Sequence, residues 1–233
     1  EYLDLAISIQ QGIYEKQVIN GKLMEIYDWK QDSSNSAIPL CYLDLLTMAK
    51  LKPYNKAWNL VSENSRSLIN KGAVGGNSPF FKKHFNYDKG QYELDEEYPR
   101  TKGICLTYTL YTAIHLAEAG QDTSYFSAWL KGEAEKGKLY GWYNPYTLMP
   151  SERFQSTAVY ALGAVYARKI GNEELYRILL GKMLQFMVIN EKSSYYGGFG
   201  NEYIGEFYSF DNLTALWACL LYTSPSPRDR TRS

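Results

Sequence analysis

The sequence carries no surplus of charge of either sign and no long hydrophobic run. Its 25 Lys and Arg residues balance 25 Asp and Glu residues, so the formal net charge is +0 at pH 7. Binding to phosphate backbones or anionic lipids depends on an excess of basic residues, so we expect no nucleic-acid partner. The apolar stretches are interrupted well before the roughly 18 residues that a bilayer span needs, so we expect no membrane span.

Cysteine and histidine are scarce, with three and two residues respectively. Cys41 and Cys105 are not closely spaced, which argues against a zinc site or a disulfide scaffold. His84 and His115 have no partners at the spacings typical of metal ligands or catalytic triads. The sequence therefore predicts no metal site and no cofactor.

The composition is otherwise that of a globular protein, with 45% hydrophobic and 15% aromatic residues in 233. This length suits one large domain or two small ones. The last residues change character abruptly. Written as codons, Cys219 to Asp229 match a transposon-end sequencing adapter read in frame. We therefore expect residues 1–218 to form a partial domain and 219–233 to be a non-native, adapter-derived tail.

Hydrophobic periodicity predicts about eight helices and no long strand, that is, an all-α fold. The predicted helices span residues 2–19, 36–51, 54–71, 102–119, 123–137, 154–170 and 173–189, and a last one opens near Asp211. Gly120 and Gly171 stand where left-handed C-terminal caps would, and Asp122 and Asn172 are suitable N-caps. Pro53 can occupy a first helical position.

An internal repeat is visible when Gly120 is aligned with Gly171, because Tyr125 and Tyr176 then coincide. In each copy the first helix is apolar nearly all round, and the second is amphipathic. This pattern predicts an inner ring of helices wrapped by an outer ring, or an open solenoid of hairpins. The ring is favoured because every long connection runs from an outer helix to the next inner helix, so all of them lie at one end.

These long connections are rich in aromatic residues and hold many of the 22 tyrosines. Aromatic faces stack on the C–H faces of sugars, and carboxylates bind their hydroxyl groups, so this rim is typical of a polysaccharide cleft. Some of the connections have the turn residues of short β-hairpins. The candidate substrate-binding residues are Asp28, Trp29, Tyr42, Trp142, Tyr143 and Tyr195. The alternative is that these side chains pack the loops onto the helices, or are simply solvated.

Four segments of this chain resemble glycoside hydrolase family 8, in particular its divergent exopolysaccharide-associated branch in Gram-positive bacteria. They are residues 27–45, 139–141, 195–200 (Tyr-Tyr-Gly-Gly-Phe-Gly) and 207–213 (Phe-Tyr-Ser-Phe-Asp-Asn-Leu). The resemblance implies an (α/α)6 toroid, of which about eight of twelve helices are present, with short β-hairpin loops on one rim. It also implies hydrolysis of a β-linked polysaccharide with inversion, which requires one carboxyl as acid and another as base.

Asp211 matches the position where the family carries a catalytic or substrate-facing Asp, and the resemblance therefore implies that it is the base. An N-cap role for the same carboxylate is the other interpretation. No residue matches the general acid, which we expect upstream of Glu1, so we expect this chain alone to be inactive. The expected partner is a polysaccharide or oligosaccharide, bound by a monomer that is extracellular or associated with the cell envelope.

Two alternatives remain open at this point. One is another toroid enzyme that acts on carbohydrate, such as a polysaccharide lyase or an unsaturated glucuronyl hydrolase. The other is a non-catalytic glycan-binding helical protein. The identity of the sugar and the choice between endo and exo action also stay open, because aromatic platforms accept many sugars.

Overall fold

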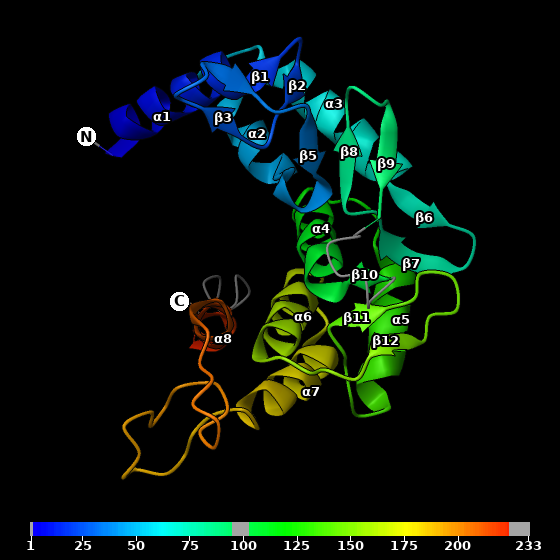
Figure 1. Ribbon diagram of the computed structural model, residues 1–233, viewed down its shortest axis with the longest axis vertical. Coiled ribbons are helices and arrows are strands. Elements are labelled where there is room, and N and C mark those ends of the chain that lie inside the picture. Colours follow the sequence, from blue (N-terminus) through cyan, green and yellow to red (C-terminus); the bar gives the residue numbers. More distant parts are fainter. Residues whose placement is uncertain (1, 95–102, 224–233) are drawn as a thin grey trace, which may run out of the picture. The chain divides into compact units, whose positions relative to one another are not determined.

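The computed structural model describes residues 2–94 and 103–223 (Figure 1). The chain divides into two compact units. The first contains Glu1–Asp122 and Asn144–Met149, and the second contains Thr123–Tyr143 and Pro150–Ser233. Each unit is described separately below. None of the described helices combines the length and the hydrophobicity that a membrane span would need.

The first unit combines helices with short antiparallel strands. Its helices are α1 (Tyr2–Gln17), α2 (Leu45–Leu51), α3 (Trp58–Lys71) and α4 (Leu106–Glu118), with a 3-10 turn, η1 (Leu40–Tyr42). Its strands are β1 (Val18–Ile19), β2 (Lys22–Leu23), β3 (Tyr27–Asp28), β4 (Ser33–Ser34), β5 (Ala37–Pro39), β6 (Ala73–Gly75), β7 (Ser78–Phe81), β8 (His84–Asn86), β9 (Gln91–Glu93) and β10 (Ile104–Cys105).

The core of the first unit is apolar and draws on α2, α3, α4 and β5. Leu43, Val61 and Ile69 in this cluster are fully buried. Burial of such side chains contributes about 1.5–3 kcal/mol each. A buried hydrogen bond of 2.6 Å from Trp58 Nε1 to Gln10 Oε1 joins α3 to α1.

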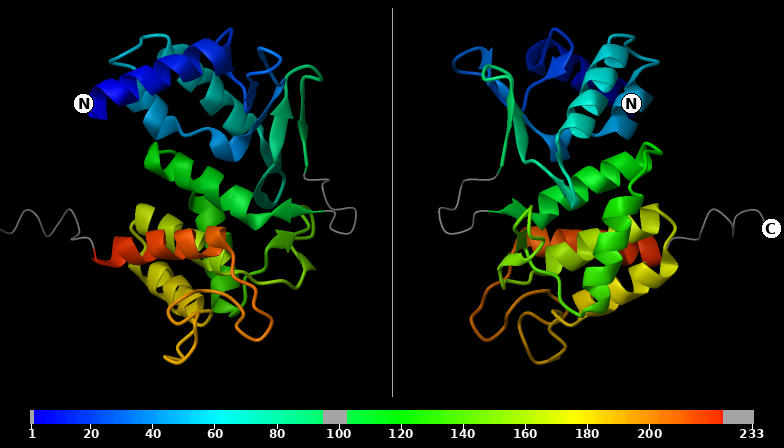
Figure 2. Two further views of the ribbon diagram at one scale, coloured as in Figure 1. Left: turned by 60° about the vertical axis from the view of Figure 1, so that its left-hand side comes forward. Right: turned by 90° about the vertical axis from the view of Figure 1, so that its right-hand side faces the viewer.

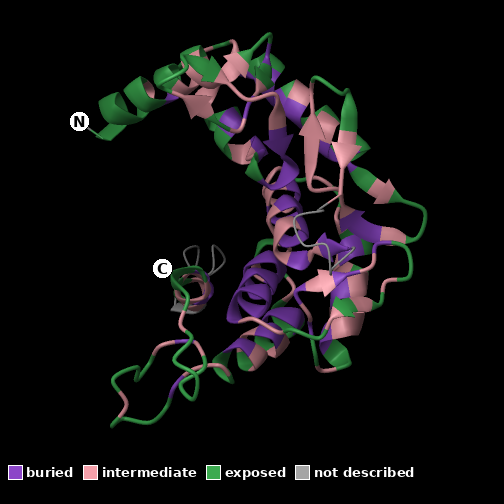
Figure 3. Cartoon of the chain, viewed as in Figure 1, coloured by how far each residue is buried: buried purple, intermediate pink, exposed green. Residues whose placement is uncertain are grey.

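The second unit is built around one helix that is buried along all but its last turn. Its elements are α5 (Ser124–Glu135), β11 (Trp142–Tyr143), β12 (Pro150–Glu152), α6 (Thr157–Lys169), α7 (Glu173–Leu184) and α8 (Ser209–Thr223). Every residue of α6 from Thr157 to Ala167 is buried (Figure 3). Helices α7 and α8 both pack against α6 and lie beside it in both views of Figure 2. The Tyr176 hydroxyl donates a 3.0 Å hydrogen bond to the Ala218 carbonyl, so α7 also holds α8.

The sequence-based prediction of a mostly helical fold is confirmed. The left-handed glycines at the helix ends are present, with φ of +68° at Gly120 and +73° at Gly171. The Asn172 side chain caps α7 by accepting a 3.0 Å hydrogen bond from Leu175 N. The N-cap of α5 is Thr123, so the prediction of Asp122 was one residue early.

The predicted helix at 36–51 is wrong in its first half. Residues 37–39 form β5, and helix α2 begins only at Leu45. Pro39 has no N–H group to donate and favours an extended Ile38, which pairs with Phe85 of β8. Pro53 does not begin a helix either, because α3 begins at Trp58.

The expected β-hairpins are present in the long connections. Strands β3–β4, β6–β7, β8–β9 and β11–β12 pair antiparallel. The β8–β9 hairpin turns at Asp88–Gly90, where Gly90 has a φ of +65°. The predicted tail boundary at residue 219 falls inside α8, and residues 224–233 lie outside the described part of the chain. That boundary stays a prediction.

Candidate functional site

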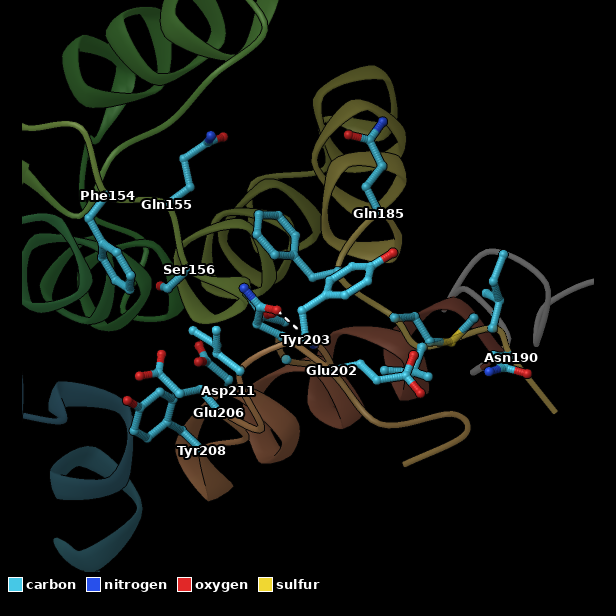
Figure 4. A pocket seen from close by; sticks show the side chains of 18 residues that line it. Phe154, Gln155, Ser156, Gln185, Asn190, Glu202, Tyr203, Glu206, Tyr208 and Asp211 are labelled. Atoms are coloured by element: carbon cyan, nitrogen blue, oxygen red, sulfur yellow. Dashed lines mark hydrogen bonds between the residues drawn. The ribbon is translucent and has the colours of Figure 1, made fainter. Parts of the chain in front are cut away.

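The second unit contains a pocket with a volume of about 870 Å³ between the start of α6, the end of α7 and the loop that leads into α8. Figure 4 shows aromatic, amide and acidic side chains around it, with Tyr208 and Asp211 toward one end of the view and Asn190 toward the other. The residues labelled there are Phe154, Gln155, Ser156, Gln185, Asn190, Glu202, Tyr203, Glu206, Tyr208 and Asp211. This mixture of flat rings and hydroxyl-binding groups suits a polar, ring-shaped ligand.

Asp211 lies in the first turn of α8 and lines this pocket. Its Oδ1 accepts a 2.7 Å hydrogen bond from Ala158 N in the first turn of α6, where Ser156 is the N-cap. The carboxylate therefore satisfies a free N–H group of the neighbouring helix, and not of its own. Burial raises the pKa of Asp211, and the Ala158 N–H lowers it. The net pKa is above the ordinary value of 3.8, which makes the carboxylate a stronger base.

Asn212, the next residue, fixes the loop that borders the pocket. Its Nδ2 donates to the Phe199 carbonyl at 2.8 Å, and its Oδ1 accepts from Phe199 N at 2.9 Å. The side chain thus pairs with the backbone of Phe199 as a neighbouring strand would. Gly200 has no room for a side chain, because an added Cβ would lie 2.5 Å from Phe207 Cδ1 and closer still to the Glu206 carbonyl oxygen. The Gly-Gly-Phe-Gly segment is therefore shaped by close packing against the residues that precede α8.

Several pocket residues have no assigned role from the sequence. Tyr203 and Tyr208 are 99% and 55% exposed, so their rings are available to a ligand. Glu202 and Glu206 are also exposed and line the pocket, so their carboxylates are accessible to a ligand there. Hydrogen bonds between the backbones of Asn201 and Glu206, at 2.9 and 3.1 Å, close the loop between them.

The candidate aromatic platforms of the second unit differ in exposure. Tyr195 is 44% exposed, and its ring stacks on Phe207 with centroids 4.2 Å apart. Trp142 is partly buried in β11. Tyr143 is fully buried, with its ring edge-on to Trp129 at 5.1 Å, and its hydroxyl accepts from Tyr140 N. The expectation of a sugar platform at Tyr143 is therefore wrong, because its ring is part of the core.

The remaining candidates belong to the first unit. Trp29 is 78% exposed and packs edge-on against Tyr27 at 4.8 Å. Asp28 Oδ1 accepts hydrogen bonds from Lys30 N at 2.8 Å and Gln31 N at 3.2 Å, so this carboxylate shapes the β3–β4 turn. Tyr42 is the last residue of η1 and is 58% exposed. Among the predicted site residues of the second unit, only Asp211 lines the pocket.

No protein-family model matches this sequence. One curated relative is the protein named "Putative lipoprotein YdaJ" from Bacillus subtilis (strain 168). It is 27% identical over 220 residues, which are 94% of this chain and 58% of the relative. The chain therefore spans less than two thirds of the relative's length.

Solved structures of carbohydrate enzymes match over almost the whole chain. A novel α-amylase from Clostridium perfringens matches with a TM-score of 0.87 and 29% identity, over 94% of this chain and 63% of that one. Cel10 from Klebsiella pneumoniae, a family 8 endoglucanase, matches with a TM-score of 0.54 and 13% identity, over 92% and 63% of the two chains. The chain has a glycoside hydrolase family 8-like fold.

The same fold extends to a second class of enzyme. The unsaturated glucuronyl hydrolase of Bacillus sp. GL1 matches with a TM-score of 0.67 and 11% identity, over 94% of this chain and 68% of that one. Its likeness and that of Cel10 show that the chain has the (α/α)6 toroid fold of these enzymes. The sequence-based resemblance to family 8 is thus confirmed at the level of the fold.

Within this family 8-like fold, sequence reasoning found the motif around Asp211 but missed its partners. Tyr203 and Tyr208 line the pocket from the loop between α7 and α8, and Gln155 lines it from the segment before α6. No spacing in the sequence relates these three residues. The Asp211-Asn212 pair did indicate a role for both residues, because Asp and Asn side chains at a helix start often form hydrogen bonds with backbone groups.

Proposed function

We propose that this chain forms part of the active site of an inverting glycoside hydrolase that acts on a β-linked polysaccharide. Asp211 is the base in this proposal, and the pocket at the start of α8 holds the sugar on one side of the scissile bond. The observation that carries the proposal is the half-buried Asp211 carboxylate, which lines a pocket with exposed tyrosines in a family 8-like fold.

The environment of Asp211 suits the task of a base. The carboxylate must be ionised at neutral pH and must still attract a proton from water. Partial burial supplies the proton affinity, and the Ala158 N–H holds Oδ1 so that the other oxygen, Oδ2, is left for a water molecule. The family's general acid has no match in this chain, so we expect the chain alone to release no reducing ends.

The test of the base is Asp211→Asn in the longest reading frame that contains this chain. The Asn side-chain oxygen can still accept from Ala158 N, so folding is expected to persist. Loss of a general base typically lowers the rate by about 100-fold to 10,000-fold, so kcat should fall by at least that lower bound. Asp28→Asn is the matched control, since that carboxylate is proposed to bind substrate at most. Unchanged kcat in Asp211→Asn would remove this residue from the mechanism.

The linkage and the stereochemistry can be tested together. A β-glucan should yield the α-anomer first if the enzyme inverts, and proton NMR of the early products distinguishes the two anomers. Soluble starch, an α-linked glucan, is the necessary comparison because the clostridial structure is named an α-amylase. Cleavage of starch but not of the β-glucan would support a glycoside hydrolase and reject the proposed β-linkage. If the β-anomer appeared first from a β-glucan, inversion would be rejected.

Unsaturated glucuronyl hydrolase activity is the second candidate, favoured by the likeness to the Bacillus sp. GL1 enzyme. Loss of the ultraviolet absorbance of an unsaturated uronyl disaccharide would reveal it, and growth of that absorbance on a uronate polymer would instead reveal a lyase. Binding of oligosaccharide without turnover by the longest reading frame would favour the non-catalytic alternative. For location, we propose the cell envelope, because the Bacillus subtilis relative is named a lipoprotein.

A further inference from the structure

The first unit brings three potential metal ligands together from two distant parts of the chain. His115 and Glu118 lie one turn apart on α4, and Asp44 is the N-cap of α2. His115 Nδ1 is 3.9 Å from Asp44 Oδ1 and 3.9 Å from Glu118 Oε2. One ligand atom of each residue lies within 4.8 Å of the others. This cluster belongs to the first unit, whereas the proposed catalytic pocket belongs to the second.

A hydrogen bond at Nε2 of His115 leaves Nδ1 on the side of the Asp44 and Glu118 carboxylates. His115 Nε2 lies 3.1 Å from the Cys41 carbonyl oxygen. A carbonyl can only accept, so Nε2 carries the hydrogen, and in the neutral ring Nδ1 therefore has a free electron pair. Within the described residues, Nδ1 is buried and has no hydrogen-bond partner. The carboxylate oxygens at 3.9 Å are too distant to accept a hydrogen bond from a protonated Nδ1.

We propose that Asp44, His115 and Glu118 bind a divalent transition-metal ion, with zinc as the expected occupant. Zinc accepts both imidazole nitrogen and carboxylate oxygen as ligands and is typically four-coordinate, whereas calcium prefers six to eight oxygen ligands. The His115–Cys41 hydrogen bond is the contact that metal-bound histidines typically make with their second nitrogen. Solvent supplies the fourth ligand, since the Asp44 side chain is 38% exposed.

The ligand spacing is close to the spacing that a zinc site requires. Zinc with ligands at about 2.0–2.2 Å in tetrahedral geometry holds its ligand atoms about 3.4 Å apart. On binding, the two 3.9 Å separations from His115 Nδ1 would close by about 0.5 Å, and the Asp44–Glu118 separation, which is at most 4.8 Å, by up to about 1.4 Å. Asp44 can bind the ion and still cap α2, because Thr47 N and Thr47 Oγ1 occupy only part of its lone pairs. The bound ion would join α2 to α4.

Isothermal titration calorimetry tests the proposal. The full 233-residue chain is first treated with a chelator and is then titrated with zinc chloride. We expect one zinc ion per chain and a rise in the melting temperature, because a ligand that binds only the folded state stabilises it. Asp44→Asn keeps an N-cap but loses the charged ligand, and His115→Gln keeps a donor for the Cys41 carbonyl but loses the imidazole. Each should weaken zinc binding about tenfold or more.

His84→Gln is the matched control. His84 also contacts a carboxylate, Glu93, at 2.7 Å, but it is not in the three-residue cluster. This variant should bind zinc as the wild type does. Visible absorption of the cobalt-substituted chain should show the intense bands of a four-coordinate ion, and Asp44→Asn should remove them. Absence of stoichiometric zinc binding by the wild type, or equal binding by Asp44→Asn and the wild type, would overturn the proposal. If His115→Gln fails to fold, Asp44→Asn decides the result.

Discussion

Leu179 and Gly163 meet where α7 packs against α6, and this contact allows a quantitative test of the second unit. Leu179 is fully buried. A Cβ added at Gly163 would lie 3.1 Å from Leu179 Cδ1 and 3.6 Å from Cδ2. Gly163 thus allows the close approach of the two helices. Because α6 also supplies the N–H that holds Asp211, the contact supports the proposed site as well.

We expect Leu179→Ala to lower the free energy of unfolding by about 2–5 kcal/mol, which is the cost of a buried cavity of this kind. Gly163→Ala alone should lower it by at most about 2 kcal/mol. Its helix-propensity gain of about 1 kcal/mol is opposed by crowding of about 1–3 kcal/mol against Leu179. In the double variant the crowding is gone and the new methyl group partly fills the cavity. The double variant should therefore be about 1–2 kcal/mol more stable than Leu179→Ala.

Urea denaturation followed by far-ultraviolet circular dichroism measures these differences, and hydrogen exchange in α6 assigns them to the second unit. Gly181→Ala on α7 is the control, because nothing lies within 4 Å of its added Cβ. It should stabilise the wild type and Leu179→Ala equally, by about 1 kcal/mol. The reasoning fails if Leu179→Ala costs less than about 1 kcal/mol, or if Gly163→Ala has the same effect with and without Leu179.

The remaining predictions concern the site. Gly200→Ala should raise KM in the longest reading frame without lowering the melting temperature of the helical core, since only the pocket loop must move; a normal KM would contradict this. Asn212→Asp loses the donor to the Phe199 carbonyl and should cost about 1–3 kcal/mol by urea denaturation; Asn212→Gln, with the same groups displaced, tests whether position matters. Because the folded pKa of Asp211 is raised, the native state holds more protons just above pH 3.8, so stability falls as pH rises through that window. Asp211→Asn should therefore gain stability relative to the wild type as pH increases, and a pH-independent difference would refute this. Tyr195→Ala should raise KM with kcat unchanged, since stacking holds substrate and transition state alike; an unaltered KM would leave Tyr195 as packing for Phe207.

The helices could be predicted because each carries its own periodic pattern and local end signals. The left-handed glycines Gly120 and Gly171 are an example, since a positive φ is a local property of the chain. The segment at 37–42 could not be predicted in this way. Its apolar residues are equally typical of a buried strand or a helix, and the pairing of β5 with β8 depends on residues more than forty positions away.

The candidate site was predictable to a similar extent. Asp211 was found because it belongs to a contiguous motif. From the sequence alone, its carboxylate could also have capped its own helix. The structure instead pairs it with Ala158, which lies 53 residues earlier. Tyr143 looked like a rim aromatic, but contact with Trp129 places it in the core. Tertiary contacts of this kind decide whether a tyrosine binds a ligand or packs, and composition does not contain them.

The adjacency of Asp211 and Asn212 has a consequence for how such an enzyme could evolve. The Asp211 side chain bonds to the start of α6, and the Asn212 side chain bonds to the backbone of Phe199. The same turn of α8 therefore fixes the position of both segments. The six residues from Asn201 to Glu206 project from this fixed base and contribute no buried side chain. Their sequence is free to diverge toward new sugars while the proposed base keeps its position. In the proposed enzyme, changes in this loop would alter substrate choice while leaving the base in place.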